Sequence, residues 1–137
     1  APISGWIADR IGFKKTLLWI LGGFVVVFPL MAVAQTFTPF AIVAVAMGPG
    51  FGAIWTITRA YLLHLTPQAM MNQSFTYYTL MERLATFIGP ISWGLIVTYL
   101  PRVNALNYRA AAAAMTLFVL IGLYFAKKLP DAKRSVA

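Results

Sequence analysis

The chain has 137 residues, of which 61% are hydrophobic and only 10% are charged, and its formal net charge is +8. A water-soluble domain carries about a quarter charged residues, so this apolar excess is expected to face a lipid bilayer. The bases are too sparse and scattered for a nucleic-acid groove, and no cysteine, one histidine and three acids argue against a metal site, a cofactor site or an enzyme.

Five apolar stretches follow one another along the chain. Residues 1–8 have the character of the last turns of a helix, and the missing initiator methionine suggests a fragment of a longer protein. The other four have about 18 to 27 residues, enough for a helix to cross ~30 Å of hydrocarbon, where backbone groups must bond internally. We therefore expect an all-α membrane protein with four full transmembrane helices plus the end of a fifth. The predicted spans are residues 16–34, 40–63, 74–100 and 109–126.

The connections between these spans carry most of the basic residues on one side of the membrane. Alternate loops lie on the same side, and the positive-inside rule places the more basic side in the cytoplasm. The polar tail, residues 127–137, is then cytoplasmic, in a multi-pass protein of the inner membrane if the source is bacterial. The basic side holds Arg10, Lys14, Lys15, Lys127, Lys128, Lys133 and Arg134, against Arg102 and Arg109 on the other.

The first connection contains the sequence GWIADRIGFKK, residues 5–15. Gly5 is expected to let a helix end pack closely against a neighbour, and Asp9 to lie where that helix ends. Gly12 permits a positive φ in the turn, and Lys14 then opens the next helix at the level of the lipid headgroups. By composition alone, an ordinary basic loop is the alternative interpretation.

The spacing Gly-x-x-x-Asp-Arg-x-Gly-x-Lys resembles the cytoplasmic loop signature of the major facilitator superfamily. In that family the signature joins the second and third helices, and a weaker copy joins the eighth and ninth. Phe13 departs from the pattern, which usually has Arg or Lys there, and so suits the weaker copy better. The resemblance implies the C-terminal part of a twelve-helix secondary transporter, whose missing N-terminal half is its partner and whose substrate is a small molecule. The matching residues are Gly5, Asp9, Arg10, Gly12 and Lys14.

A second stretch, residues 58–94, has a Thr-Arg pair near the end of a helix, a loop proline, an aromatic helix start, a base and a Gly-Pro pair. It is similar to the autophagy-related vacuolar effluxer family and its bacterial relatives. The loop lacks the acid that relatives often have, and Thr76 stands where Gly is common. This resemblance implies export of an amino acid or another small metabolite. The matching residues are Thr58, Arg59, Pro67, Phe75, Tyr77, Tyr78, Arg83, Gly89 and Pro90.

Apart from Arg109 at the start of the last span, three charged residues lie within the predicted spans, where charge is costly and therefore indicates function. Arg59 can extend to the headgroups or pair with Asp9; the family resemblance implies a charge cluster of Asp9, Arg10 and Arg59 that braces one conformation. Glu82 is either a proton-coupling acid or half of a structural salt bridge, for which Arg59 is a candidate. Arg83 points about 100° away from Glu82 on a helix, so the two need separate partners or one aqueous cavity.

Other residues of the second and third spans complete the predicted site. Trp55 and Tyr78 are candidates for lining the transport path, with packing in the core or against lipid as the alternative. Pro49, Gly89 and Pro90 are candidate hinges for alternating access, although glycine and proline are also common in ordinary membrane helices. A small four-helix membrane scaffold or subunit without transport activity is the alternative function.

Overall fold

The computed structural model describes residues 2–34, 36–101 and 106–131, without the side chains of residues 2–4 and Asp9. Within these ranges the chain forms helices and no strand, and four of the helices are long and apolar enough to cross a membrane. The predicted fold class, all-α with four membrane-length helices and the end of a fifth, is confirmed. The elements are α1 (Pro2–Ile11), α2 (Phe13–Val33), α3 (Phe37–Leu65), the 3-10 helix η1 (Gln68–Met70), α4 (Met71–Tyr99) and α5 (Leu106–Lys128).

Each long helix begins three residues before the span that hydropathy outlines. α2 begins at Phe13 rather than at residue 16, and α5 begins at Leu106 and ends at Lys128. The connection predicted over residues 64–73 is shorter, because α3 continues to Leu65 and η1 forms within it. The physical reason is that hydropathy marks only the part of a helix that suits hydrocarbon, whereas polar residues in the terminal turns still make helical hydrogen bonds at the headgroup level.

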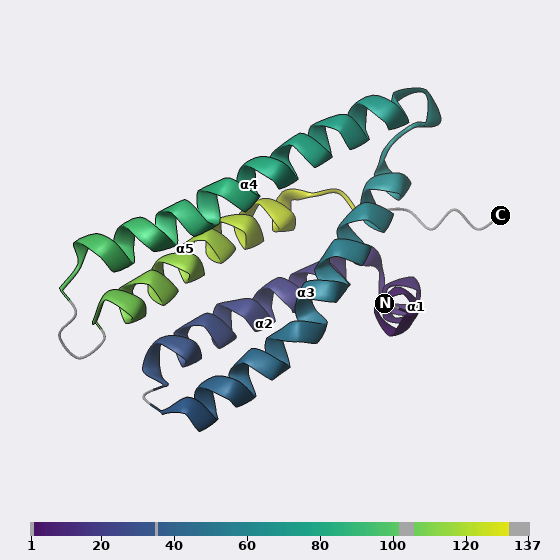
Figure 1. The fold of residues 1–137 in the computed structure, drawn as a ribbon. Coiled ribbons are helices and arrows are strands. Elements are labelled where there is room, and N and C mark those ends of the chain that lie inside the picture. The colour runs from purple at the N-terminus through teal and green to yellow at the C-terminus, as the bar shows by residue number, and fades with distance from the viewer. Residues whose placement is uncertain (1, 35, 102–105, 132–137) are drawn as a thin grey trace.

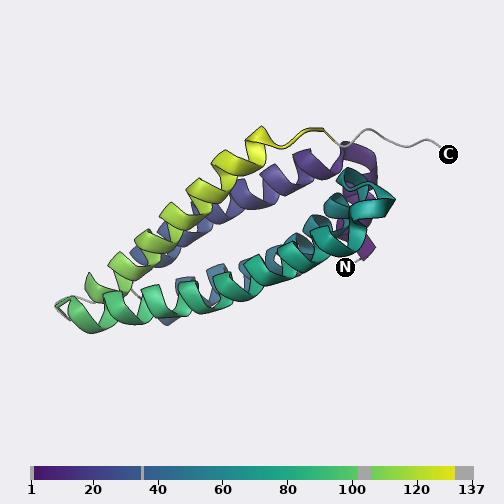
Figure 2. The same cartoon turned by 90° about the horizontal axis from the view of Figure 1, so that it is seen from above.

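The four long helices are arranged in two layers (Figure 1). α2 and α5 lie side by side in one layer and make the most extensive helix contact in the described structure. α3 and α4 lie in the other layer, where α3 packs on α2 and α4 packs on α5, as the view from above shows (Figure 2). α3 and α4 contact each other over a short stretch only. α1 lies against α2 and α3 at one end of the bundle.

The buried core is concentrated at the end of the bundle where α1 lies. Its members come from α1, α2, α3 and α5, and side chains of α2 and α3 such as Phe13 pack around them. α4 contributes nothing to it and has no fully buried residue among those described. The start of α2 and the ends of α1, α3 and α5 meet at this end of the bundle. We call it the basic pole, because these helix ends carry Arg10, Lys14, Lys127 and Lys128. The core residues are Ala8, Leu17, Ile57, Tyr61 and Ala126.

The helices continue without interruption through their internal prolines, including Pro49 in α3 and Pro90 in α4. Close approach of α2 and α3 occurs at Gly50, where an added Cβ would lie 3.1 Å from the ring of Phe24. An added Cβ at Gly5 or at Gly89 would meet no atom within 4 Å. The close packing expected at Gly5 is therefore not seen around the position of an added Cβ in the described structure.

Candidate functional site

The turn of the loop motif consists of one residue, Gly12. α1 continues to Ile11, and so the backbone of Asp9 and Arg10 is helical rather than part of the turn. Gly12 has φ 102°, a conformation that favours glycine. Its N–H donates to the Ala8 carbonyl at 2.8 Å, and its carbonyl accepts from the Thr16 N–H at 3.0 Å. Gly12 thus redirects the chain while its own backbone groups stay hydrogen-bonded.

Phe13, which departs from the family pattern, packs in an aromatic cluster. Its ring centroid lies 4.5 Å from that of His64 and 6.5 Å from that of Tyr61, with the Tyr61 ring nearly parallel. The His64 Nδ1 lies 2.8 Å from the carbonyl of Ala60, one turn earlier in α3. The start of α2 is therefore joined to the end of α3 by ring packing, where a base would have offered a charge.

The segment after α5 crosses the same pole. The Tyr61 hydroxyl donates a hydrogen bond to the carbonyl of Pro130. The Asp131 carboxylate lies 3.7 Å from Nζ of Lys14, in an ion pair whose Asp131 side chain is largely exposed. Exposed pairs of this kind contribute little on their own, so the contact of Tyr61 with Pro130 is the stronger link between this segment and α3.

The predicted cluster of Asp9, Arg10 and Arg59 stays a prediction, because the structure describes partners for the two arginines only. The Asp9 side chain lies outside the description, as do Arg102, Lys133 and Arg134. The Arg10 guanidinium lies 4.1 Å from the ring centroid of Trp6, one turn back in α1. Arg59 extends instead to α4, and so the two arginines have different partners.

Arg59 and Glu82 form an ion pair between α3 and α4. The distance from Nη2 of Arg59 to Oε2 of Glu82 is 3.5 Å. That oxygen is buried and accepts no hydrogen bond from the described residues. Arg59 therefore balances the negative charge of Glu82 without a hydrogen bond. The Arg59 guanidinium also lies 5.6 Å from the ring centroid of Trp55. Arg59, the one partner named for Glu82 from the sequence, lies beside it in the structure.

A hydrogen bond lies next to this ion pair, because Thr58 directly precedes Arg59 in α3 and Tyr78 lies one turn before Glu82 in α4. The hydroxyls of Thr58 and Tyr78 are 2.9 Å apart, and the Thr58 hydroxyl also donates to the Ile54 carbonyl at 2.7 Å. Tyr78 therefore donates to Thr58. Together with the Arg59–Glu82 pair, this bond forms a polar bridge where α3 and α4 approach. Because these helices make little other contact, the polar bridge is their main specific link.

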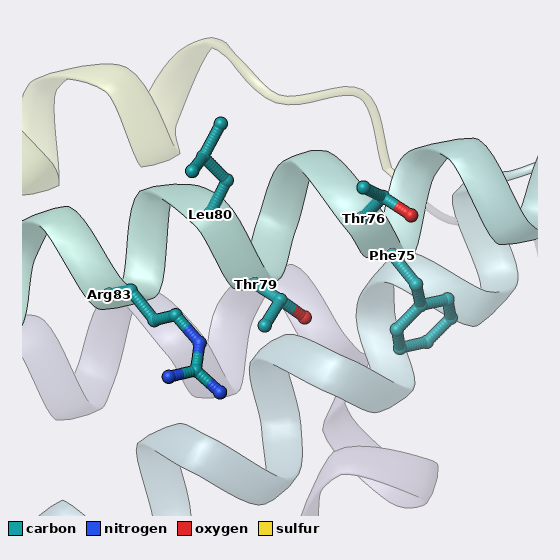
Figure 3. Close-up of a pocket in the computed structure, with 5 residues that line it drawn as sticks. All are labelled: Phe75, Thr76, Thr79, Leu80 and Arg83. Atoms are coloured by element: carbon teal, nitrogen blue, oxygen red, sulfur yellow. The ribbon is translucent and has the colours of Figure 1, made fainter.

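Arg83 lies apart from the polar bridge, although it follows Glu82 in the chain. It lines a shallow groove of about 440 Å³ on α4. Phe75, Thr79 and Arg83 extend from one side of the helix (Figure 3). Such a groove with one guanidinium and nearby hydroxyls is suited to hold an anionic group. The groove is lined by Phe75, Thr76, Thr79, Leu80 and Arg83.

The sequence did not predict some of the contacts at the basic pole or the contact between α4 and α5. From the sequence, Phe13 is only a lost base, and Tyr61 and Asp131 have no assigned role. One feature of the sequence could have predicted this aromatic cluster. Phe13 is aromatic where the family has a base, and Tyr61 and His64 lie one turn apart near the end of another helix. Asn107, predicted to lie in a loop, is in α5 and is buried, and its Nδ2 donates to the Val97 carbonyl of α4 at 3.2 Å. That hydrogen bond joins the end of α4 to the start of α5, a contact that hydropathy does not predict.

Comparisons with known proteins agree with the helical layout and the loop motif. Residues 1–137 match the family model of the Major Facilitator Superfamily. The chain is 30% identical over 103 residues to the putative multidrug resistance protein MdtD of Pectobacterium atrosepticum. It is 27% identical over 103 residues to the proteins of that name from Salmonella typhimurium and Salmonella enteritidis.

Each of these alignments covers 72% of the chain and 21% of the relative, so the chain spans about a fifth of the length of the curated relatives it matches. No solved structure matches it. The narrower resemblance to the autophagy-related vacuolar effluxer family is not confirmed and stays a prediction. The family match, in contrast, extends over every residue of the chain, which therefore belongs to the Major Facilitator Superfamily.

Proposed function

We propose that the chain forms the C-terminal part of a twelve-helix secondary transporter that exports a small solute by alternating access. The basic pole is then cytoplasmic, because Arg10, Lys14, Lys127 and Lys128 all belong to helix ends that meet there, and cytoplasmic ends carry the excess of bases. Family membership and the short span relative to the curated relatives support a role as one part of a longer transporter.

The observation that carries this proposal is the distribution of charge between the two layers. In α2 and α5 every Lys and Arg lies in the first or last four residues, as Lys14 and Lys128 illustrate. In the layer of α3 and α4, Arg59, Glu82 and Arg83 lie six or more residues from the nearer helix end, within helices long enough to cross a membrane. Charge at that depth is costly unless it faces a bundle interior or water. The layer of α3 and α4 is therefore the one expected to border the transport path, with α2 and α5 outside it.

Export is the direction that the relatives favour, since those relatives are named putative multidrug resistance proteins. An amino acid or another small metabolite is the substrate class that the effluxer resemblance favours. A decisive experiment uses the full-length protein from the reading frame that contains this chain. Cells preloaded with labelled amino acids, organic acids and lipophilic drugs should lose at least one of them faster when they express the transporter.

The control for that experiment is a variant in the polar bridge. Arg59→Ala should abolish the accelerated loss while the protein still inserts, because Glu82 is then left with a buried carboxylate oxygen that has no partner. Lys15→Ala, changed at the basic pole, serves as the matched variant with normal export. If no solute in the panel is exported by the wild-type protein, the alternative of a membrane scaffold without transport activity is favoured instead.

Glu82 can act in this transporter in two ways. Paired with Arg59, it can hold α3 against α4; protonated, it would release Arg59 and couple proton movement to the opening of that contact. Export measured across pH separates the two for Glu82→Gln. A coupling role predicts that the remaining activity no longer depends on pH, whereas reduced activity with an unchanged pH profile indicates a purely structural pair.

A further inference from the structure

Arg83 lies close to the middle of α4, twelve residues after the start of that helix at Met71. At a rise of ~1.5 Å per residue it is about 18 Å along the axis from that end. A lysine or arginine near a helix end can extend to the headgroups, but a charge at this depth needs an anionic partner or water. Its position therefore requires either a counter-charge or water from the transport path.

No acid whose side chain the structure describes supplies such a counter-charge. The sequence has three of them. The Glu82 carboxylate pairs with Arg59, and Asp131 pairs with Lys14 at the basic pole. Asp9 belongs to α1, which makes no contact with α4 in the described structure. Glu82 and Asp131, the two acids whose side chains the structure describes, form no ion pair with Arg83.

The groove beside Arg83 supplies the other features of an anion site. The Thr76 hydroxyl donates to the Asn72 carbonyl at 2.8 Å, and so it is already engaged. The Thr79 hydroxyl makes no hydrogen bond in the described structure and extends from the same side of α4 as Arg83 and Phe75 (Figure 3). A guanidinium binds a carboxylate through two parallel hydrogen bonds, and a free hydroxyl adds a third donor.

Resting on the proposed transport function, we infer that Arg83 binds a carboxylate of the transported substrate in this groove, with Thr79 as a second donor. The ring of Phe75 lies two turns nearer the basic pole and offers an apolar surface to the rest of the molecule. Arg59 and Glu82 neutralise each other, so the α3–α4 layer carries one uncompensated positive charge at membrane depth. The substrate class is thus a small organic carboxylate, or an amino acid bound through its carboxylate, rather than a lipophilic cation.

The test measures binding of three nearly isosteric probes to the purified full-length transporter in lipid nanodiscs. Benzoate, benzamide and benzamidine share a ring and differ in charge, which is −1, 0 and +1 at neutral pH. Isothermal titration should give the tightest binding for benzoate. Arg83→Gln should weaken benzoate binding by about tenfold or more, the loss of a bidentate charged contact, and should leave benzamide binding unchanged.

Arg83→Lys is the second variant, since it keeps the charge but loses the paired donors, and it should retain part of the preference for benzoate. Arg109→Gln, at the start of α5, is the matched charge control and should bind benzoate as the wild type does. Equal binding of the three probes by the wild-type protein overturns the assignment even if Arg83→Gln fails to insert. Wild-type benzoate affinity in Arg83→Gln also overturns it, and leaves Arg83 as the partner of an acid elsewhere in the transporter.

Failure of this inference is distinguishable from failure of the proposed function. A transporter that exports solutes of the panel but binds benzoate and benzamidine equally keeps its transport function and loses the carboxylate site. A protein that exports nothing from the panel fails the proposed function through a measurement that does not involve the three probes.

Discussion

α2 and α4 are both long helices that could cross a membrane, yet they are packed in opposite ways. α2 contacts α1, α3 and α5 and contributes buried residues, whereas α4 packs mainly on α5 and has no fully buried residue. If exposure meant contact with lipid, α4 would be the more apolar helix. It instead carries Glu82, Arg83 and several threonines. The difference indicates that part of the α4 surface faces protein or water rather than hydrocarbon.

The largest effect that separates the two regions is expected from truncation of the core. Ile57 is 1% exposed at the basic pole, whereas Ile91 of α4 is 57% exposed. Ile57→Ala leaves a cavity among packed side chains, and we expect it to lower the free energy of unfolding by about 2–4 kcal/mol. Ile91→Ala should cost less than about 1 kcal/mol, because lipid can fill the space left by a lipid-facing side chain.

Denaturant titration of the two full-length variants in mixed micelles measures this difference. Equal losses for both variants would break the comparison, since Ile91 would then be packed against helices that lie outside this chain. That outcome would locate the contact surface of α4 with the rest of the transporter.

The second effect concerns the polar bridge, which joins α4 to α3. Removal of either member of the Arg59–Glu82 pair should lower stability by about 1–3 kcal/mol, less than for a fully buried pair because Arg59 is half exposed. The double variant Arg59→Leu, Glu82→Leu should recover part of that loss, since no unpaired charge remains. Thermal unfolding of the four proteins forms a double-mutant cycle, and strictly additive losses would contradict a direct pair.

Much of the fold follows from the sequence because hydropathy and loop charge are local signals. The spans, the turn at Gly12 and the gathering of bases on one side need only the order of residues along the chain. The contacts between helices, in contrast, cannot be predicted from the order of residues alone. The pairing of Arg59 with Glu82 was one of several open alternatives, and only the approach of α3 and α4 selects it. The packing of Phe13 on Tyr61 and His64 depends on where α3 ends relative to α2, which no periodicity reports.

The smallest expected effect comes from Phe13, on the well-packed side of the comparison. Phe13→Lys restores the base that the family usually has, but it removes the ring contacts with His64 and Tyr61 and adds a third positive charge beside Lys14 and Lys15. We expect a loss of about 1 kcal/mol in stability. Phe13→Tyr keeps the ring and should unfold at the wild-type temperature. A stabilised Phe13→Lys would instead mean that an acid takes up the new charge, and Asp9, four residues earlier, would be the first acid to test by adding Asp9→Asn.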